Sequence, residues 1–323
     1  MRSRSNGPRV VREPRVQDAA AVARLRIAIN PHQVVTARTI RHRANRPVER
    51  ERRRDWIADA GGDVVGCAQA GFEWSVPTPG KGYVWIGVHP EQRGQGIGRA
   101  LYATARDDLI AKGAVRLRTW VDADPAGERF VRKLGFQRGS ADQVSEVDPR
   151  EVDFSELPRL EERGFGLAPL GEVRSQVHEL YEICAAGERD MPSDEPETEL
   201  DVESWKREEF DVPDLSDEGS FVALAGDRPV SLAFMVVDPE RRIAYNQMTA
   251  TLPEYRRRGL ALMVKLAAVR WAAEGGIERL LTENDTRNVG MLAINERLGY
   301  RPLYVQRSWT LDLQRERPAR ERR

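Results

Sequence analysis

The chain has 323 residues, enough for two domains of ordinary size, and 40% of the residues are hydrophobic, which suffices for a core in each. No apolar run approaches the roughly 18 residues of a membrane-spanning helix, and the basic N-terminus lacks the apolar segment of a secretory signal. We therefore expect a cytoplasmic protein without a membrane partner. Only five of the 51 basic residues are lysine, and no basic patch is interleaved with aromatic residues, so we expect no nucleic-acid partner.

The net charge of zero hides an asymmetry between the two halves. Residues 1–150 carry 27 basic and 17 acidic residues, whereas the remaining 173 residues carry 24 basic and 34 acidic ones. This pattern fits either attraction between two domains or recognition of a charged partner. Cys67 and Cys184 lie in different halves without metal-ligand spacing, so we expect buried thiols and no metal site.

Hydrophobic periodicity and turn residues predict a mixed α/β order in the first half. The helices are expected to begin at capping residues, Asp18 for the first and Asp124 for the last, and the helix after the third long strand should end at Gly113. The expected elements are a strand at 10–12, helices at 18–29 and 36–45, strands at 56–58, 64–74 and 83–88, a helix at 96–112, a strand at 115–121, a helix from 124, and closing strands after Phe136.

The second half predicts the same order of elements again. The segment 141–163 between the halves reads as a last strand followed by a linker helix. The expected elements are a strand at 165–167, helices at 173–185 and 202–210, strands at 221–225, 230–237 and 243–250, a helix at 260–273, a strand at 279–282, a helix at 289–298 and a strand at 305–313.

A glycine-rich loop joins the strand at 83–88 to the following helix. Because Gly94, Gly96 and Gly98 lack Cβ atoms, a pyrophosphate can approach the unpaired amide groups at the start of the helix. Arg93 and Arg99 add positive charge beside the loop. The spacing is neither that of a P-loop nor that of a dinucleotide fingerprint.

The loop pattern occurs a second time, 163 positions later, in residues 251–261. Both copies read Pro-Glu-x-Arg-x-x-Gly-x-Gly/Ala, and both lie between a strand-like run and a long apolar-periodic helix. Each copy is followed by a helix that ends in Leu-Gly-aromatic, at 134–136 and at 298–300. The recurrence indicates two tandem copies of one domain.

Arg-x-x-Gly-x-Gly/Ala after a strand resembles the acetyl-CoA pyrophosphate loop of the GCN5-related N-acetyltransferase (GNAT) superfamily, and the tandem arrangement is similar to that of mycothiol synthases. The resemblance implies an α/β fold of two tandem domains, each with a mixed, mostly antiparallel sheet flanked by helices. The expected boundaries are a disordered tail at 1–7, domains at 8–150 and 164–313, a linker at 151–163 and a charged tail at 314–323.

The resemblance also implies that acetyl-CoA is the co-substrate, held by backbone groups of a strand and by the loop after it. It assigns cofactor binding in the first domain to Ile86, Gly87, Val88, Arg93, Gly94, Gln95, Gly96, Ile97, Gly98 and Arg99. It assigns cofactor binding in the second domain to Thr249, Ala250, Thr251, Arg256, Arg257, Arg258, Gly259, Leu260, Ala261 and Asn288.

The sequence departs from the family pattern at the groups that carry protons. Many members have a tyrosine three residues before the leucine of Leu-Gly-aromatic, where this chain has Val131 and Asn295. The family asparagine ten residues before that leucine is Asn288 in the second repeat, and Asp124, better explained as a helix cap, in the first. These departures leave open whether one repeat binds cofactor without turnover.

We favour the second repeat as the catalytic one. Period-two alternation predicts Tyr245, Gln247, Thr249 and Thr251 on one face of the strand beside the expected thioester. Tyr245 and Glu283 are the candidate catalytic residues, with Glu283 as a general base through water. The alternatives are a packing role for the tyrosine and a solvated surface position for the glutamate.

The resemblance implies a primary amine as the acceptor and places the acceptor site beside the segment between the first two helices of a repeat. In the second repeat this segment is acidic, so we expect a small, cationic molecule. The alternative is a solvated acidic loop. Its acidic residues are Asp190, Asp194, Glu195, Glu197, Glu199, Asp201, Glu203, Glu208, Glu209, Asp211, Asp214, Asp217 and Glu218. The matching part of the first repeat is basic, with Arg38, Arg41, His42, Arg43, Arg46, Arg50, Arg52, Arg53 and Arg54.

Four other functions remain open at this point. They are acetylation of an amino-sugar conjugate as by mycothiol synthase, acetylation of an aminoglycoside-like antibiotic, acetylation of protein amines, and acetyl-CoA binding without catalysis. Neither the acyl-chain preference nor the oligomeric state follows from the sequence.

Overall fold

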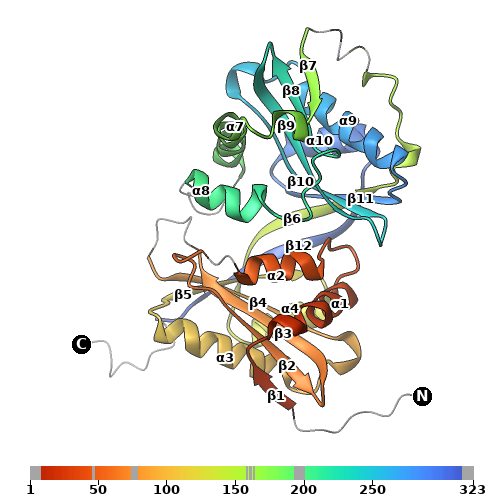
Figure 1. Ribbon diagram of the computed structural model, residues 1–323. Coiled ribbons are helices and arrows are strands. Elements are labelled where there is room, and N and C mark those ends of the chain that lie inside the picture. The colour runs from red at the N-terminus through yellow and green to blue at the C-terminus, as the bar shows by residue number, and fades with distance from the viewer. Residues whose placement is uncertain are drawn as a thin grey trace. The chain divides into compact units, whose positions relative to one another are not determined.

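The computed structural model describes residues 9–45, 48–73, 79–157, 159, 162, 164–192 and 201–314 (Figure 1). The tail predicted at 1–7, most of the tail predicted at 314–323 and part of the linker predicted at 151–163 lie outside the described residues. The chain divides into two compact units, one of residues 1–140 and 307–323 and the other of residues 141–306.

The first unit is an α/β layer built on strands in the order β1-β2-β3-β4-β5-β12, where β12 is Arg301–Asp312. Strands β1 to β4 pair antiparallel, and β4 pairs parallel with β5. The elements are β1 (Arg9–Arg12), α1 (Ala19–Ile29), α2 (Ala37–Asn45), β2 (Arg54–Ala60), β3 (Asp63–Phe72), β4 (Lys81–Val88), α3 (Ile97–Ala111), β5 (Arg116–Asp122) and α4 (Pro125–Lys133).

Helices cover both faces of the first sheet. On one face, α3 buries Leu101, Ala105 and Leu109 against Leu117. On the other face, Leu25 of α1 packs against Cys67 of β3. The two faces alternate along β3, because an added Cβ at Gly66 would meet Ile97 and Leu101 of α3, whereas the next residue, Cys67, belongs to the cluster around α1.

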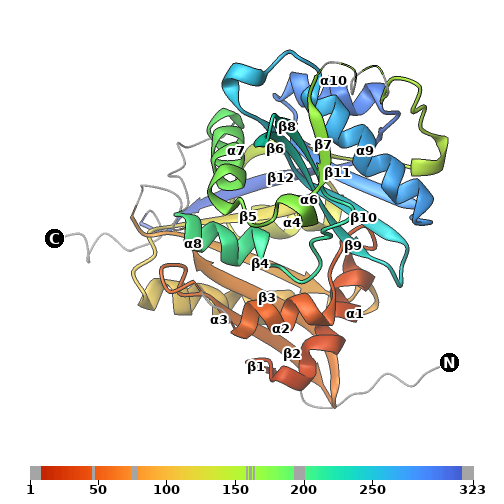
Figure 2. The ribbon, with the colours of Figure 1, turned by 45° about the horizontal axis from the view of Figure 1, so that its top comes forward.

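The second unit repeats this plan with strands in the order β6-β11-β10-β9-β8-β7 (Figure 2). β10 pairs parallel with β11, and the other pairs, β11 with β6 included, are antiparallel. The elements are β6 (Gln137–Val147), β7 (Gly166–Pro169), α6 (Leu170–Val173), α7 (Val177–Asp190), α8 (Val202–Trp205), β8 (Phe221–Ala225), β9 (Arg228–Asp238), β10 (Ile243–Thr251), α9 (Leu260–Glu274), β11 (Arg279–Asp285), α10 (Val289–Arg297) and β12 (Arg301–Asp312).

The last strand of each repeat is divided between the two units. Residues 141–147 of β6 belong to the second unit, where β6 pairs with β11. The end of β12 belongs to the first unit, where Trp309 and Leu311 join the core of α3. The sequence repeats, expected at 8–150 and 164–313, therefore do not coincide with the compact units, and those boundaries stay predictions.

Two local expectations about helix starts have different outcomes. Asp124 caps α4 as predicted, since its carboxylate accepts hydrogen bonds from the amides of Ala126 at 2.7 Å and Gly127 at 3.1 Å. The predicted cap at Asp18 is wrong. A short 3-10 turn, Val16–Asp18, precedes α1, and the Asp18 carboxylate accepts from Arg12 and from the amide of Arg15 instead.

The helix predicted at 173–185 is also modified. It is divided into α6 and α7, and α7 continues to Asp190.

Both cysteines are buried free thiols, as predicted. Within the described residues, no helix is long and apolar enough to cross a membrane.

Close approach of α3 to β3 predicts that Gly66→Ala destabilises the protein. An added Cβ would lie 2.9 Å from Ile97 Cγ2 and 3.0 Å from Leu101 Cδ1, and overpacking of this kind costs about 1–3 kcal/mol. Thermal unfolding should show a lower Tm. The control is Gly290→Ala in α10, where nothing lies within 4 Å of the added Cβ and the helix gains about 0.5–1 kcal/mol. Equal Tm values for the two variants would contradict this packing.

Candidate functional site

In each unit, two parallel strands pair at one end and then separate. β4 pairs with β5 only at 81–83 with 116–118, although β4 continues to Val88. β10 pairs with β11 only at 243–246 with 279–282, although β10 continues to Thr251. The backbone of 86–88 and of 249–251 therefore borders the space where the strands diverge. These are the residues predicted to hold the pantetheine arm of acetyl-CoA.

Each diverging strand leads into a loop that leaves a helix N-terminus uncapped by side chains. The N-caps are Gly96 (φ 83°) and Gly259 (φ 83°), and neither position supplies a capping side chain. The first intrahelical hydrogen bonds come from the amides of Ala100 and Met263, so the preceding amides of each first turn lack helical acceptors. Amides of this kind, at the positive end of the helix dipole, suit the oxygens of a pyrophosphate.

The arginines at the start of the two loops have structural contacts. Arg93 Nε donates to the carbonyl of Val88 at 3.3 Å, and Arg256 Nε donates to the carbonyl of Thr251 at 3.0 Å. Arg256 also forms an ion pair with Asp190 at the end of α7. These side chains fix the loop to the end of its strand, which leaves the loop amides as the groups best placed to bind phosphate.

Arg257 adopts a backbone conformation that glycine normally supplies. Its φ is 58°, and the equivalent residue of the first loop is Gly94, with φ 75°. A residue with a Cβ pays a steric penalty in this left-handed region. The second loop therefore keeps a strained arginine beside the predicted pyrophosphate position.

The register of β10 shifts by one residue between Asn246 and Met248, which changes the predicted face of the strand. Tyr245 pairs with Val236 of β9, whereas Thr249 pairs with Ala233, so the two side chains lie on opposite faces. The expectation that Tyr245, Gln247, Thr249 and Thr251 share one face is wrong for this reason. Thr249 and Thr251 share a face with Asn246, while Tyr245 faces the side on which α7 packs against Ala250 and Met248.

Tyr245 and Glu283, the predicted catalytic pair, lie together on the face of α7. The Tyr245 hydroxyl donates to Glu283 Oε2 at 3.4 Å. Burial raises the pKa of Tyr245 well above its ordinary value, and the charge of Glu283 adds to the effect. Tyr245 is therefore a protonated hydrogen-bond donor at neutral pH, and Glu283 is the carboxylate that it orients.

The opposite face, covered by α9, holds a buried lysine. Lys265 is 2% exposed, and its Nζ donates to Asn246 Oδ1 and lies 5.2 Å from the centre of the Tyr300 ring. Thr249 Oγ1 donates to the same Asn246 oxygen at 2.9 Å. Burial lowers the pKa of Lys265 to about 7, so this amine can gain or lose a proton near neutral pH.

More amide groups continue this polar cluster towards α10. Asn295, at the family's tyrosine position, donates to Asn284 Oδ1 at 2.7 Å. Asn295 Oδ1 and the Tyr300 hydroxyl are buried and lack hydrogen-bond partners among the described residues. Buried polar atoms without partners are costly to keep, so they mark a candidate site for a polar ligand group.

The same positions of the first unit are mostly apolar. Lys81 of β4 pairs with Arg116 of β5, and Ile243 of β10 pairs with Arg279 of β11, so the two parallel strand pairs can be aligned residue by residue. The second unit has Asn246, Lys265, Asn284, Asn295 and Tyr300 where the first has Val84, Tyr102, Val121, Val131 and Phe136. The two units share the loop and the diverging strands but differ in the chemistry between those strands.

The remaining predicted residues are placed as follows. Asn288 caps α10, because its Oδ1 accepts from the amide of Met291 at 3.2 Å. The acidic segment is partly neutralised, since Asp211 and Asp217 both pair with Arg174. Four of its members, Asp194, Glu195, Glu197 and Glu199, lie outside the described residues, as does Arg46 of the basic segment. No cluster of metal ligands occurs within the described ranges.

Sequence reasoning missed Lys265 and Asn246. The signal for Lys265 was present, because a single lysine interrupts the apolar helix 260–269, and the chain has only five lysines. Asn246 had no comparable signal. Asn246 shares a face with Thr249 only because the register of β10 shifts between them, and simple alternation does not anticipate such a shift.

Comparisons with known proteins agree with this geometry. The family model described as "Acetyltransferase (GNAT) family" matches residues 21–136 and 177–300. A mycothiol acetyltransferase of Streptomyces coelicolor is 26% identical over 242 residues, which cover 74% of both chains. A mycothiol acetyltransferase of Kocuria rhizophila is 38% identical over 80 residues. This match covers 26% of the relative's length and 22% of this chain.

Solved structures show the same fold over most of the chain. A tandem GNAT protein from the clavulanic acid biosynthesis pathway matches with a TM-score of 0.70 at 19% identity, covering 95% of this chain and 99% of that one. A GCN5-related N-acetyltransferase from Sphaerobacter thermophilus matches with a TM-score of 0.65 at 16% identity, covering 97% and 98%. The predicted tandem fold is confirmed.

The strain at Arg257 predicts different stabilities for two substitutions. Arg257→Gly and Arg257→Ala both remove the charge, but only glycine is relaxed at a φ of 58°. Arg257→Gly should therefore be more stable than Arg257→Ala by about 1 kcal/mol, measured by urea unfolding. An alanine variant as stable as the glycine variant would contradict a strained backbone at this residue.

The buried amine of Lys265 predicts a pH-dependent stability. Between about pH 7 and 10.5 the unfolded chain binds the proton that the folded chain has released, so the free energy of unfolding rises with pH across this window. Lys265→Met lacks this cost. At pH 6 the free energy of unfolding of Lys265→Met should exceed that of the wild type by several kcal/mol, because each unit of pKa shift corresponds to about 1.4 kcal/mol. The difference should shrink towards pH 10.

Urea unfolding at pH 6 and pH 9 measures this difference. Lys133→Met, at an exposed lysine of α4, is the control and should keep the pH profile of the wild type. A stability difference between wild type and Lys265→Met that is the same at both pH values would argue against a buried amine with a lowered pKa.

Proposed function

The chain belongs to the acetyltransferase (GNAT) family, and we propose that this N-acetyltransferase moves acetyl from acetyl-CoA to a primary amine of a small, cationic molecule in its second unit. The observation that carries the choice of unit is the polar cluster on the face of β10 and β11 that α9 covers. Asn246, Lys265 and Asn295 stand there, where the first unit has Val84, Tyr102 and Val131.

Acetyl-CoA is proposed to bind in the same way in both units. The amides at the start of α3 and α9 take the pyrophosphate, and the strand backbones at 86–88 and 249–251 take the pantetheine arm. The uncapped helix N-termini and the diverging strands support this assignment. Because the first unit has an apolar lining, we propose that it binds acetyl-CoA without catalysing transfer.

The reaction requires removal of a proton from the ammonium, attack of the free amine on the thioester carbon, and protonation of the leaving thiolate. We assign the first proton transfer to Glu283, directly or through one water, with Tyr245 orienting the carboxylate through its hydroxyl. The register shift at Gln247 leaves a residue outside the regular ladder, and its backbone amide is the proposed donor to the developing oxyanion.

Lys265 is the candidate source of the proton for the thiolate. Its pKa of about 7 allows the ammonium form to donate near neutral pH, and it belongs to the cluster that contains Asn295 at the family's tyrosine position. This role would compensate for the missing tyrosine.

The proposal that the acceptor is cationic is based on the acidic segment of the second unit. Within its described part, Asp190, Asp211 and Asp217 are engaged by arginines. A cationic acceptor is therefore supported by the composition of the segment more than by free carboxylates. The cytoplasmic location, the absence of nucleic-acid and membrane partners, and the oligomeric state stay predictions.

A second candidate acceptor is an amino-sugar conjugate of the kind acetylated by mycothiol acetyltransferases. The observation that favours it is the match to the Streptomyces coelicolor enzyme over 74% of both chains. An amine panel that contains such a conjugate beside simple polyamines distinguishes this acceptor from the first.

Titration of acetyl-CoA into matched loop variants tests the proposed function. Gly96→Glu and Gly259→Glu each place bulk and negative charge where one pyrophosphate should lie. The wild type should bind two equivalents by calorimetry, and each variant should bind one. Release of coenzyme A thiol with the amine panel should be lost only in Gly259→Glu. Loss only in Gly96→Glu would reverse the assignment, and no binding by the wild type would refute the proposal.

Glu283→Gln tests the proposed base separately. Turnover should fall by about 10²- to 10⁴-fold, as expected for loss of a general base, while the affinity for acetyl-CoA stays unchanged. The control is Glu278→Gln, at a partly exposed glutamate that pairs with Arg242 just before β11. Turnover that survives in Glu283→Gln would exclude this carboxylate as the base.

A further inference from the structure

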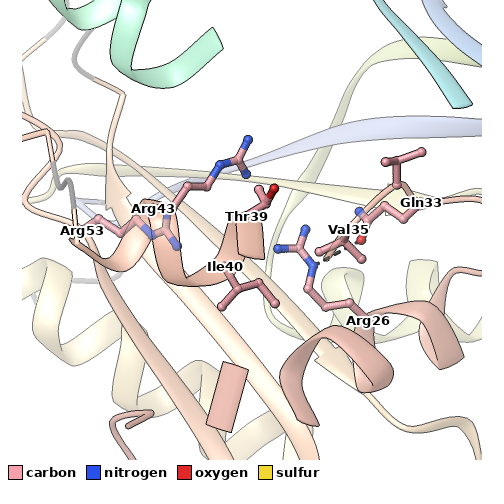
Figure 3. Close-up of a pocket in the computed structure, with 8 residues that line it drawn as sticks. Arg26, Gln33, Val35, Thr39, Ile40, Arg43 and Arg53 are labelled. Carbon is pink, nitrogen blue, oxygen red and sulfur yellow. Dashed lines mark hydrogen bonds between the residues drawn. The ribbon is translucent and has the colours of Figure 1, made fainter. Parts of the chain in front are cut away.

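The first unit contains a basic cavity that the proposed reaction does not use. Its volume is about 200 Å³, and residues from α1, α2, the segment between them and the residue just before β2 form its walls (Figure 3). The lining consists of Arg26, Gln33, Val34, Val35, Thr39, Ile40, Arg43 and Arg53.

Among the residues that the structure describes, two of the three arginines in this cavity have no carboxylate within ion-pair distance. Arg53 pairs with Asp55 through two hydrogen bonds of 3.1 and 3.0 Å. Arg26 donates to the neutral side chain of Gln33 at 3.2 Å and stacks over Trp85, 4.9 Å from the ring centre. Within the described residues, Arg43 Nε is buried without a hydrogen-bond partner. The cavity thus holds an excess of positive charge.

No neighbouring thiolate compensates for this charge. Cys67 lies beside Arg26, but burial raises the pKa of Cys67 to about 12, so the thiol is neutral at physiological pH. Burial and the nearby Arg43 and Arg53 lower the pKa of Arg26, although Asp55 and, at the high pH where a guanidinium titrates, Cys67 act in the opposite direction. Placing like charges together out of water is unfavourable, and a bound anion would remove that cost.

We propose that this cavity binds a small molecule through an oxyanion, either a carboxylate or a phosphate group. Guanidinium groups match such oxyanions because their donors form a planar fork. The unpartnered Nε of Arg43 supplies one donor, and Arg26, held in place by Trp85 and Gln33, supplies another.

The size and location of the cavity restrict the ligand. Its volume of about 200 Å³ is below the roughly 300–1,000 Å³ typical of sites for drug-sized ligands, so the group held inside is small. Trp85, which stacks on Arg26, directly precedes the 86–88 segment of β4. A bound oxyanion would therefore lie beside the strand that borders the divergence from β5. This inference does not depend on which unit catalyses acetyl transfer.

Calorimetric titration of the full chain with inorganic phosphate and with succinate, at constant ionic strength set with chloride, tests the proposal. At least one of the two should bind, and the stronger one identifies the source of the oxyanion. Arg43→Gln and Arg26→Gln should each weaken that binding by about tenfold to a hundredfold, the size expected for loss of a charge-assisted hydrogen bond. Binding of neither anion would overturn the proposal.

Matched controls separate the cavity from general charge and from the coenzyme loops. Arg41→Gln on α2 and Arg24→Gln on α1 remove exposed arginines that do not line the cavity, and both should keep wild-type affinity. Binding should also persist in the presence of saturating coenzyme A and in Gly96→Glu. Equal losses in all four arginine variants, or displacement of the anion by coenzyme A, would overturn the assignment. Thermal melts of every variant identify any loss of folding.

Discussion

The divergence of β10 from β11 is the constraint on which the second unit depends. Four residues of each strand pair in parallel, and beyond Asn246 and Thr282 the strands separate. Separation leaves backbone groups exposed inside the sheet, which a folded protein normally avoids. α9 starts beside this opening with its amides uncapped by side chains, so one break in the sheet brings together strand backbone, helix dipole and buried polar side chains.

The second unit keeps features that lower its stability near this opening. Lys265 is buried at a lowered pKa, and Arg257 has a left-handed backbone where the first unit uses glycine. The first unit has the same loop and the same divergence but fills the equivalent space with Val84 and Phe136, and it carries its unbalanced charge in the cavity of Arg26 and Arg43 instead. Charged side chains are thus buried at different places in the two units. This is the pattern expected if the two units bind different ligands.

Much of the fold could be predicted from the sequence, because periodicity, capping residues and the repeated loop act locally. Strand β8 occurs at Phe221–Ala225 as expected, and Asp124 caps α4. The division of β6 and β12 between the units could not be predicted, since it depends on pairing between residues far apart in sequence. The face of Tyr245 was predicted wrongly because one additional residue in β10 reverses the alternation. Tyr245 and Glu283 nevertheless lie together, because Tyr245 pairs with Leu281 of β11 and Glu283, two residues further on, shares the face of Leu281.

The rate of coenzyme A release by Asn246→Val tests most directly whether the polar cluster of the second unit supports catalysis. This variant gives the second unit the residue found at the equivalent position of the first. Acetyl-CoA stoichiometry measured on the same sample shows whether the variant is folded. We predict that Asn246→Val still binds two equivalents of acetyl-CoA but turns over at least 100-fold more slowly, about 3 kcal/mol in activation free energy. The matched variant Val84→Asn should turn over at the wild-type rate. An Asn246→Val protein with wild-type turnover would contradict the claim that the polar cluster of the second unit supports acetyl transfer.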